Sequence, residues 1–375
     1  MTRPARQAET DDVSAAFHVA MTQIGVHTTA EALALWAEVP ADLRAATAGG
    51  WLRRAISLVM GRRRQARDLA RAYYRLARAL QTGTTVADPY HPEPERVTLG
   101  DLRREFAALA GTYNPPGSSR EGEAATGESG ETSASHEVHQ QPAEEGNPAS
   151  SHGDGGHELD DGADDWENVL VEELRGLREE EERIERAAEE ELRTVLDALG
   201  TQNLNRRLAK MDDQQSAKDA DAARAEAHRQ AGARQAAAAS RVAMNGGRSS
   251  TWAHMRRDRR ALGYVRLSRT GTPCGWCAML ISRGPVYKSR ESAVFYDGDK
   301  YHDNCNCYAA PIWNRGEYQS SELTALSREF ESLWPEVTKG HTGKDAISVW
   351  RRFIRQKQRA AAREARQSTT TTPEA

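Results

Sequence analysis

The sequence predicts a mainly α-helical protein that ends in a small α+β module stapled by a metal ion. Three observations favour this class. Long stretches carry apolar residues at helical spacing, residues 115–165 are acidic and poor in apolar residues, and the only four cysteines lie between Cys274 and Cys307. Because 38% of the residues are hydrophobic and 28% are charged, much of the chain is expected to be solvated helix or disorder.

The first region, residues 1–114, is predicted to be helical because its apolar residues recur at steps of three and four. Thr28, Thr29 and Glu31 form the pattern of a helix cap, so one helix is expected to end before them and another to begin. The expected helices span residues 12–24, 31–37, 51–80 and 98–113, the last with Thr98 or Asp101 near its start.

The helix expected over residues 51–80 is rich in arginine, and Asp68 is its only acid. Clustered arginines supply a sequence-independent attraction for phosphate, so this face could contact packaged DNA or an acidic partner. The alternative is a solvated helix face, and the arginines of 256–260 and 351–352 are open to the same two interpretations. The candidate nucleic-acid or partner-binding residues are Arg62, Arg63, Arg64, Arg67 and Arg71.

Residues 115–165 are predicted to form a disordered acidic linker. This stretch has no aromatic residue, no lysine and a single arginine, Arg120. It cannot bury enough apolar surface to offset the conformational entropy that ordering would remove. Its four histidines lie among acids and glycines and are interpreted as part of a flexible spacer.

A long helical region is predicted over residues 166–245. Trp166, Leu170, Leu174 and Leu177 recur at helical spacing and indicate a packing stripe. The sequence Asn245-Gly246-Gly247 is expected to end this helix, because glycine is the usual residue just beyond a helix C-terminus.

The remaining chain is predicted to form a compact α+β module over residues 246–320, followed by C-terminal helices and a disordered tail over 321–375. Alternation indicates an exposed edge strand over 263–270. A second short strand is expected over 307–313, and helices are expected over 326–333 and 345–363.

The informative motif of the module combines Cys274-Gly-Trp-Cys277 with His302-Asp-Asn-Cys305-Asn-Cys307. A CxxC turn presents two thiolates to one point, and zinc takes about four nitrogen or sulfur ligands. Cys274, Cys277 and Cys305 are the first candidates for ligands, and His302 and Cys307 compete for the fourth place. The prediction is a structural zinc ion, from which a small module with few apolar residues gains folding energy.

The cysteines also allow uses other than metal binding. A disulfide or idle thiols would leave the motif without chemistry. Cys274-Gly-Trp-Cys277 looks like a thioredoxin-type redox site, but such a site needs a βαβ context. A Pro-Cys-x-x-Cys sequence also matches half of a zinc deaminase signature, whose other half would be His91-Pro92-Glu93 in a proline-broken loop.

The runs 264–280, 282–287 and 301–308 resemble the C-terminal module of phage Mu F-like minor head proteins, in particular those of actinobacterial phages. That family carries C-x-x-C and then H-P-x-C-x-C, and this sequence has Asp303 in place of the proline. The resemblance implies a minor head protein in capsid assembly near the portal, whose partners are portal, scaffold or major capsid protein and possibly packaged DNA.

Two alternatives remain open at this point. Some relatives are described as capsid maturation proteases, although this chain has no G-x-S-x-G element and a Cys305–His302 pair would have to serve. A DNA-binding internal or ejected virion protein is the other. No membrane is expected as a partner, since no stretch of about 18 apolar residues and no signal-peptide core occurs. A small-molecule substrate is not expected either. The expected location is the host cytoplasm during assembly and then the virion.

Overall fold

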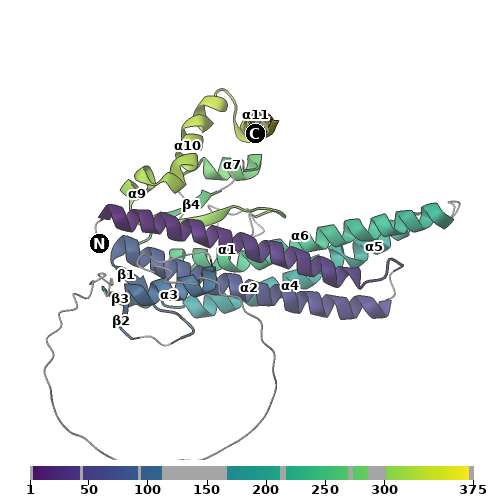
Figure 1. Ribbon diagram of the computed structural model, residues 1–375, viewed down its shortest axis with the longest axis horizontal. Coiled ribbons are helices and arrows are strands. Elements are labelled where there is room, and N and C mark those ends of the chain that lie inside the picture. Colours follow the sequence, from purple (N-terminus) through teal and green to yellow (C-terminus); the bar gives the residue numbers. More distant parts are fainter. Residues whose placement is uncertain are drawn as a thin grey trace, which may run out of the picture. The chain divides into compact units, whose positions relative to one another are not determined.

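The computed structural model describes residues 3–42, 45–91, 94–111, 167–211, 217–268, 273–285 and 301–370, and it is mainly α-helical, as predicted (Figure 1). The predicted disordered linker and the last residues of the predicted tail lie outside this part of the chain. The helices before the module are α1 (Arg3–Ala37), α2 (Ala45–Thr82), α3 (Leu99–Ala110), α4 (Leu177–Leu199), α5 (Thr201–Leu208) and α6 (Ala217–Arg257).

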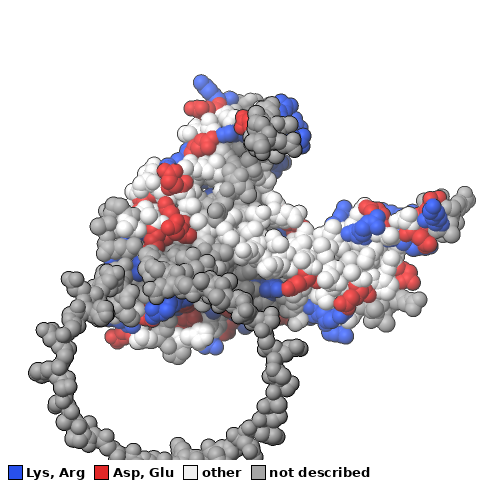
Figure 2. Space-filling view, viewed as in Figure 1, with Lys and Arg blue, Asp and Glu red and all other residues white. Residues whose placement is uncertain are grey.

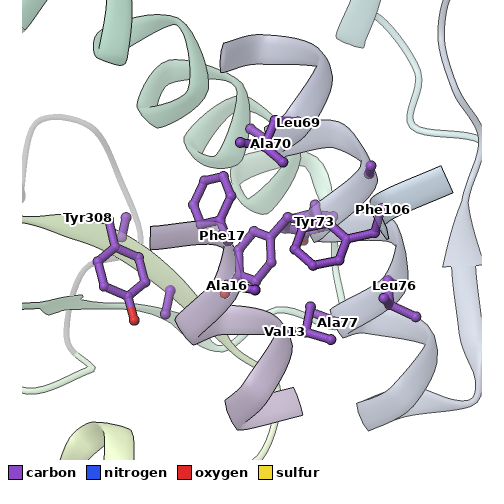
Figure 3. Close-up of a cluster of buried hydrophobic side chains, with 14 of the residues drawn as sticks. Val13, Ala16, Phe17, Leu69, Ala70, Tyr73, Leu76, Ala77, Phe106 and Tyr308 are labelled. Carbon is purple, nitrogen blue, oxygen red and sulfur yellow. The ribbon is translucent and has the colours of Figure 1, made fainter. Parts of the chain in front are cut away.

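Helices α1, α2 and α6 pack side by side along much of their length, with α4 beside α2 and α6 (Figure 1). One core cluster at this bundle is built on aromatic contacts. Phe17 of α1 stacks on Tyr73 of α2 with ring centroids 4.2 Å apart, and Tyr308 meets Phe17 edge-on at 6.1 Å (Figure 3). A second cluster holds Trp36 against Trp51.

The break expected at Thr28 does not occur, and the prediction of two short helices was wrong, because α1 is continuous. The Thr28 hydroxyl donates to the Ile24 carbonyl at 2.6 Å, and the Thr29 hydroxyl donates to the Gly25 carbonyl at 3.0 Å. Both hydroxyls therefore bond back into the preceding turn instead of capping a new helix. By contrast, α3 begins as predicted, with a capping box between Thr98 and Asp101.

The start of the region predicted as one long helix is a strand. β3 (Asn168–Glu172) pairs in parallel with β1 (Thr84–Val86) and antiparallel with β2 (Arg96–Thr98), which gives a three-stranded sheet in the order β1-β3-β2. Val169 is buried and Leu170 is exposed, so the period is two rather than 3.6. The apolar spacing through Leu170 and Leu174 was therefore misinterpreted as a helical stripe, and Trp166 lies outside the described residues.

Gly246 and Gly247 do not end a helix, because α6 continues to Arg257. They instead allow α6 to approach α2 closely. A Cβ at Gly246 would lie 2.3 Å from the Arg63 carbonyl oxygen, and one at Gly247 would lie 2.7 Å from the Ala66 carbonyl oxygen. The same residue type that caps helices elsewhere serves here as a packing contact between two long helices.

Replacement of Gly246 by alanine is expected to destabilise the protein by about 1 to 3 kcal/mol, since the backbone carbonyl of Arg63 cannot move aside without shifting α2. Gly61→Ala in α2 is the matched control, because nothing lies within 4 Å of its added Cβ. The control should gain about 1 kcal/mol from helix propensity. Urea unfolding of both variants checks this, and an unchanged midpoint for Gly246→Ala would contradict the close helix contact.

The arginine face of α2 is largely internal. Arg63 and Arg71 have side-chain exposures of 3% and 6%; Arg63 pairs with Glu185 at 2.9 Å and Arg71 with Asp68 at 2.6 Å. Their prediction as nucleic-acid-binding residues is corrected here, because buried charges that are matched by carboxylates do not face a ligand. Arg62 pairs with Glu31, Arg67 is mostly buried, and Arg64 is exposed. DNA contact by Arg64 stays a prediction.

Arg78 carries the deepest of these ion pairs. Its guanidinium donates to Asp258, with Nε 2.7 Å from Oδ2, and both side chains are at most 1% exposed. Tyr74 and Trp313 also donate to Asp258, at 2.9 Å and 3.1 Å. Burial alone would raise the pKa of Asp258, but the bonds from Arg78 and Trp313 hold it below its ordinary value. This carboxylate thus links Tyr74 and Arg78 of α2 to the end of α6 and to Trp313.

Asp258→Asn is expected to destabilise the protein by about 3 to 5 kcal/mol, because it leaves the Arg78 charge buried beside a neutral amide. Glu172→Gln removes the more exposed acid partner of Arg78 and should cost about 1 kcal/mol or less. Because the folded-state pKa of Asp258 is lowered, its contribution is present at neutral pH and is lost on acidification. The difference in melting temperature between wild type and Asp258→Asn should therefore shrink as the pH is lowered from 7 to 3. A difference that stays constant over this range would refute the ion-pair account.

The C-terminal module contains the short strands that were expected. β4 (Gly263–Leu267) pairs antiparallel with β5 (Tyr308–Ile312), with Gly263 opposite Ile312 and Leu267 opposite Tyr308. Every residue of β4 is buried, so the expected exposed edge was wrong; the strand is covered because side chains of β4 and β5 join the bundle core. The other elements are α7 (Gly275–Ile281), α9 (Arg315–Ser320), the 3-10 turn η1 (Glu322–Thr324), α10 (Ala325–Val337) and α11 (Gly343–Thr370).

Cores continue across two of the predicted segment borders. The bundle core runs from α1 and α2 into β4 and β5, and a further cluster joins Cys277 of α7 with Phe330 of α10 and Trp350 of α11. Residues on both sides of the predicted borders at 245/246 and 320/321 therefore share apolar contacts. No described helix is long and apolar enough to cross a membrane.

Candidate metal centre

The CxxC pair is set by the first turn of α7. Cys274 is the N-terminal cap of this helix, and its sulfur accepts a hydrogen bond from the Cys277 backbone N–H at 3.4 Å. Residues three apart lie on the same side of a helix, so the two sulfurs face one point. Gly275 between them lets α11 come close, since a Cβ there would lie 2.9 Å from Cγ of Arg351.

The second motif forms a tight loop just before β5. The Cys305 N–H donates to the His302 carbonyl at 3.1 Å, and Asn304 takes a left-handed conformation with φ of 61°. Asparagine is one of the few side chains that adopts this region readily, which explains its place in the turn. The loop returns the chain so that His302, Cys305 and Cys307 face α7.

The five predicted ligands come together as two overlapping triplets. Cys274, Cys277 and His302 form one, and Cys277, Cys305 and Cys307 form the other; within each triplet the ligand atoms lie within 4.8 Å of one another. His302 Nε2 is 3.0 Å from the Cys274 sulfur and 3.7 Å from the Cys277 sulfur. The sulfurs of Cys277 and Cys305 are 3.4 Å apart. Cys277 is therefore the shared member of the cluster.

These separations fit zinc better than a disulfide. Ligand sulfurs about 2.3 Å from a tetrahedral zinc are separated by roughly 3.8 Å, and sulfur–nitrogen pairs by slightly less. A disulfide would need a sulfur–sulfur distance of about 2.05 Å. None of the four cysteines forms a disulfide, and the sulfurs of Cys277 and Cys305 are 3.4 Å apart. A donor set of thiols and one imidazole is the set that structural zinc prefers.

The choice of the fourth ligand remains between His302 and Cys307. His302 contacts Cys274 and Cys277, whereas Cys307 belongs to the triplet with Cys277 and Cys305. His302 Nδ1 lies 2.7 Å from the Asp303 carbonyl, which leaves Nε2 directed at the sulfurs. A backbone carbonyl in this position fixes the ring of a metal-bound histidine in many sites.

Local electrostatics favour charged ligand forms at the outer edge of the cluster. A hydrogen bond from the Cys277 thiol, followed by the influence of His302, lowers the pKa of Cys274 to about 4. The same contact with the Cys274 sulfur raises the pKa of His302 to about 9. Thiolate is the form that binds metal, and a metal ion would displace the proton from the imidazole.

Two buried arginines contact the loop that carries His302, Cys305 and Cys307. Arg248 of α6 donates to the Cys307 carbonyl at 3.0 Å, and it also donates to the Cys305 carbonyl. Arg248 and Arg266 of β4 each lie 3.9 Å from the ring centroid of Tyr301. Sequence reasoning missed both arginines, because nothing in the local pattern of α6 links residue 248 to a loop almost sixty residues later.

The cluster is closed on its inner side. Cys277, Cys305 and Cys307 are 1%, 3% and 4% exposed, and they share an apolar cluster with Phe330, Trp350 and Ile354. On this side, the sulfurs and the apolar cluster would shield a bound metal ion from water. Structural zinc sites are closed in the same way. Cys274 is partly exposed and His302 is exposed, so the outer edge alone faces solvent.

The enzyme interpretations of the CxxC motif are not matched by the fold around it. The motif lies between β4 and β5, which are antiparallel, whereas a thioredoxin-type site needs a parallel βαβ unit. His91, from the deaminase interpretation, bonds to Asp88 at 3.1 Å, and Pro92 and Glu93 lie outside the described residues.

The family model described as VG15 protein matches residues 203–333, a span that contains α6, both module strands and all five candidate ligands. VG15 is a family of viral gene products, and the match suggests a phage protein. No curated protein and no solved structure gives a significant match.

Purified under reducing conditions, the chain is expected to carry about one zinc per molecule. Cys277→Ser should lose the metal, because it removes the sulfur common to both triplets, and its melting temperature should fall by several degrees. His302→Ala and Cys307→Ser should differ, and the variant that keeps its metal marks the residue that is no ligand.

Asp303→Asn is the control for this series, since Asp303 lies in the same loop but pairs with Arg241 at 2.8 Å. It should keep full metal content in elemental analysis. Two results together would overturn the coordination model: no metal in the purified wild-type protein, and the same melting temperature for wild type and Cys277→Ser.

Proposed function

We propose that this protein is a minor head protein of a tailed phage, acting in capsid assembly near the portal, with a structural zinc module as its rigid docking unit. The observation that carries the proposal is the convergence of five metal-type ligands inside the segment that the VG15 model matches. The likeness of this motif to Mu F-like minor head proteins supports the finer assignment.

Partners in this proposal are the portal, scaffold or major capsid protein. The protein would act in the host cytoplasm during assembly and then remain in the virion, in the capsid interior or at the portal. Zinc would fasten α7 to the loop before β5, so that the module presents one fixed surface. The metal contributes no chemistry in this role, because its ligands are protein side chains packed against an apolar core.

The capsid maturation protease is kept as a second candidate because of one observation. Cys274 and His302 lie 3.0 Å apart at the exposed edge of the cluster, which is the separation of a nucleophile and its base. The sequence motif alone points to Cys305 for this role, but Cys305 is buried, whereas Cys274 is partly exposed. A metal ion bound to Cys274 would prevent it from acting as a nucleophile. The same molecule could therefore not bind zinc through Cys274 and use Cys274 for catalysis at the same time.

Mass spectrometry of purified heads and of portal-containing assembly intermediates tests the proposal. The chain is expected in both, at low copy number, alongside capsid protein. Virions assembled with Cys277→Ser should contain less of the protein, because the docking unit is loosened. Absence of the wild-type chain from heads and from intermediates would refute the assignment.

Incubation of purified capsid protein with this chain separates the second candidate. Zinc-loaded protein should leave the capsid protein intact if the metal is structural. Cleavage by metal-free protein that Cys274→Ser abolishes, and that zinc suppresses, would establish the protease instead.

A further inference from the structure

Helix α11 carries a concentrated positive charge on a chain that is acidic as a whole. The helix holds eight basic and two acidic residues, whereas the complete chain has a formal net charge of -4. In Figure 2 the blue side chains near the C-terminal end of α11 gather at the top of the view. The net negative charge of the chain would repel a polyanion, so a polyanion that binds would have to do so through a local basic surface.

Four arginines of α11 form one continuous line. Arg352, Arg355, Arg359 and Arg363 follow at steps of three, four and four, which places them on one face of the helix. At 1.5 Å per residue the line extends for roughly 17 Å. All four side chains are exposed. Among the described residues, no carboxylate forms an ion pair with any of them.

The opposite face anchors only the first half of the helix. Ala346, Trp350 and Ile354 are buried against α7 and α10, and the side chain of Gln358 donates to the Pro273 carbonyl at 3.0 Å. Beyond Gln358 the described side chains are exposed or nearly so. The arginine line thus starts on a fixed base and continues along a helical segment that the rest of the module does not cover.

Helix stability alone does not account for this pattern. Basic residues favour a helix C-terminus through the helix dipole, but the effect is confined to the last turn. Arg352 and Arg355 lie more than three turns before Thr370, the end of α11. Arginines that serve only the fold elsewhere in this protein, such as Arg63 and Arg78, are buried and paired with acids. The α11 arginines share neither property.

We propose that the arginine line of α11 is a docking surface for the phosphate backbone of duplex DNA. A protein partner usually contributes an apolar centre to its interface, and α11 has no large apolar side chain after Ile354 to complement one. Charged contacts without an apolar centre are typical of sequence-independent binding to DNA. Ala360, Ala361 and Ala362 keep the segment slender, and the major groove of B-DNA admits a helix, whereas that of duplex RNA is too narrow.

The test measures binding of a short labelled DNA duplex to the full-length, metal-loaded chain over a series of salt concentrations. The triple variant Arg355→Gln, Arg359→Gln, Arg363→Gln removes up to three phosphate contacts. Its log–log salt slope should be smaller by about 2 to 3, and its affinity near physiological salt should fall by roughly tenfold or more. The corresponding arginine-to-lysine triple keeps the charge and should keep most of the slope.

The matched control neutralises three exposed arginines of α6, namely Arg224, Arg229 and Arg234, of which the first two pair with acids of their own helix. This control should bind DNA like wild type. Equal losses in both triples, or an unchanged slope in the α11 triple, would overturn the proposal. So would tighter binding to an RNA duplex, or α11-dependent binding to polyglutamate without α11-dependent binding to DNA.

Discussion

The architecture depends on neutralising arginines inside the bundle. Arg63, Arg71 and Arg78 project from α2 into positions that water does not reach, and a buried guanidinium without a carboxylate would be strongly destabilising. Their acids come from later segments as well as from α2 itself: Glu185 and Glu181 from α4, and Asp258 from the end of α6. Correct pairing therefore requires α4 and α6 to take their places beside α2, so the ion pairs specify the arrangement as well as stabilise it.

The candidate metal centre is built on the same scaffold. Once α6 lies beside α2, Arg248 and Arg241 of α6 reach the loop before β5, where they bind the Cys305 and Cys307 carbonyls and Asp303. Helix α1 adds a contact between His18 and the Asn306 carbonyl. The three candidate ligands of this loop are thus positioned by elements more than fifty residues away. The other two candidates, Cys274 and Cys277, are positioned locally, by the helix turn that Cys274 caps.

Sequence reasoning succeeded where the signal is local and failed where partners are distant. The helix start at Thr98, the helix predicted over residues 51–80 and the two module strands follow from patterns within a few residues. The spacing of the four cysteines and of His302 selected the five residues that the fold brings together. Gly246 and the arginines of α2 were misjudged, because their roles depend on a helix or an acid that lies far along the chain. The sequence does not distinguish a glycine at a helix–helix contact from a glycine at a helix end, because the difference lies in the packing of distant segments.

The proposed zinc site and the basic helix are mechanically connected. Gly275, inside the CxxC turn, has Arg351 of α11 against its Cα, and Cys277 shares an apolar cluster with Trp350 and Ile354. A metal ion that fixes Cys274 and Cys277 would therefore fix the surface on which α11 rests. The arginine line begins one residue after Arg351. Because Trp350 and Ile354 on the opposite face are buried against the same cluster, the packing at the start of α11 sets the direction in which the arginine line runs. A metal ion that stiffens this packing would therefore also fix the orientation of the line.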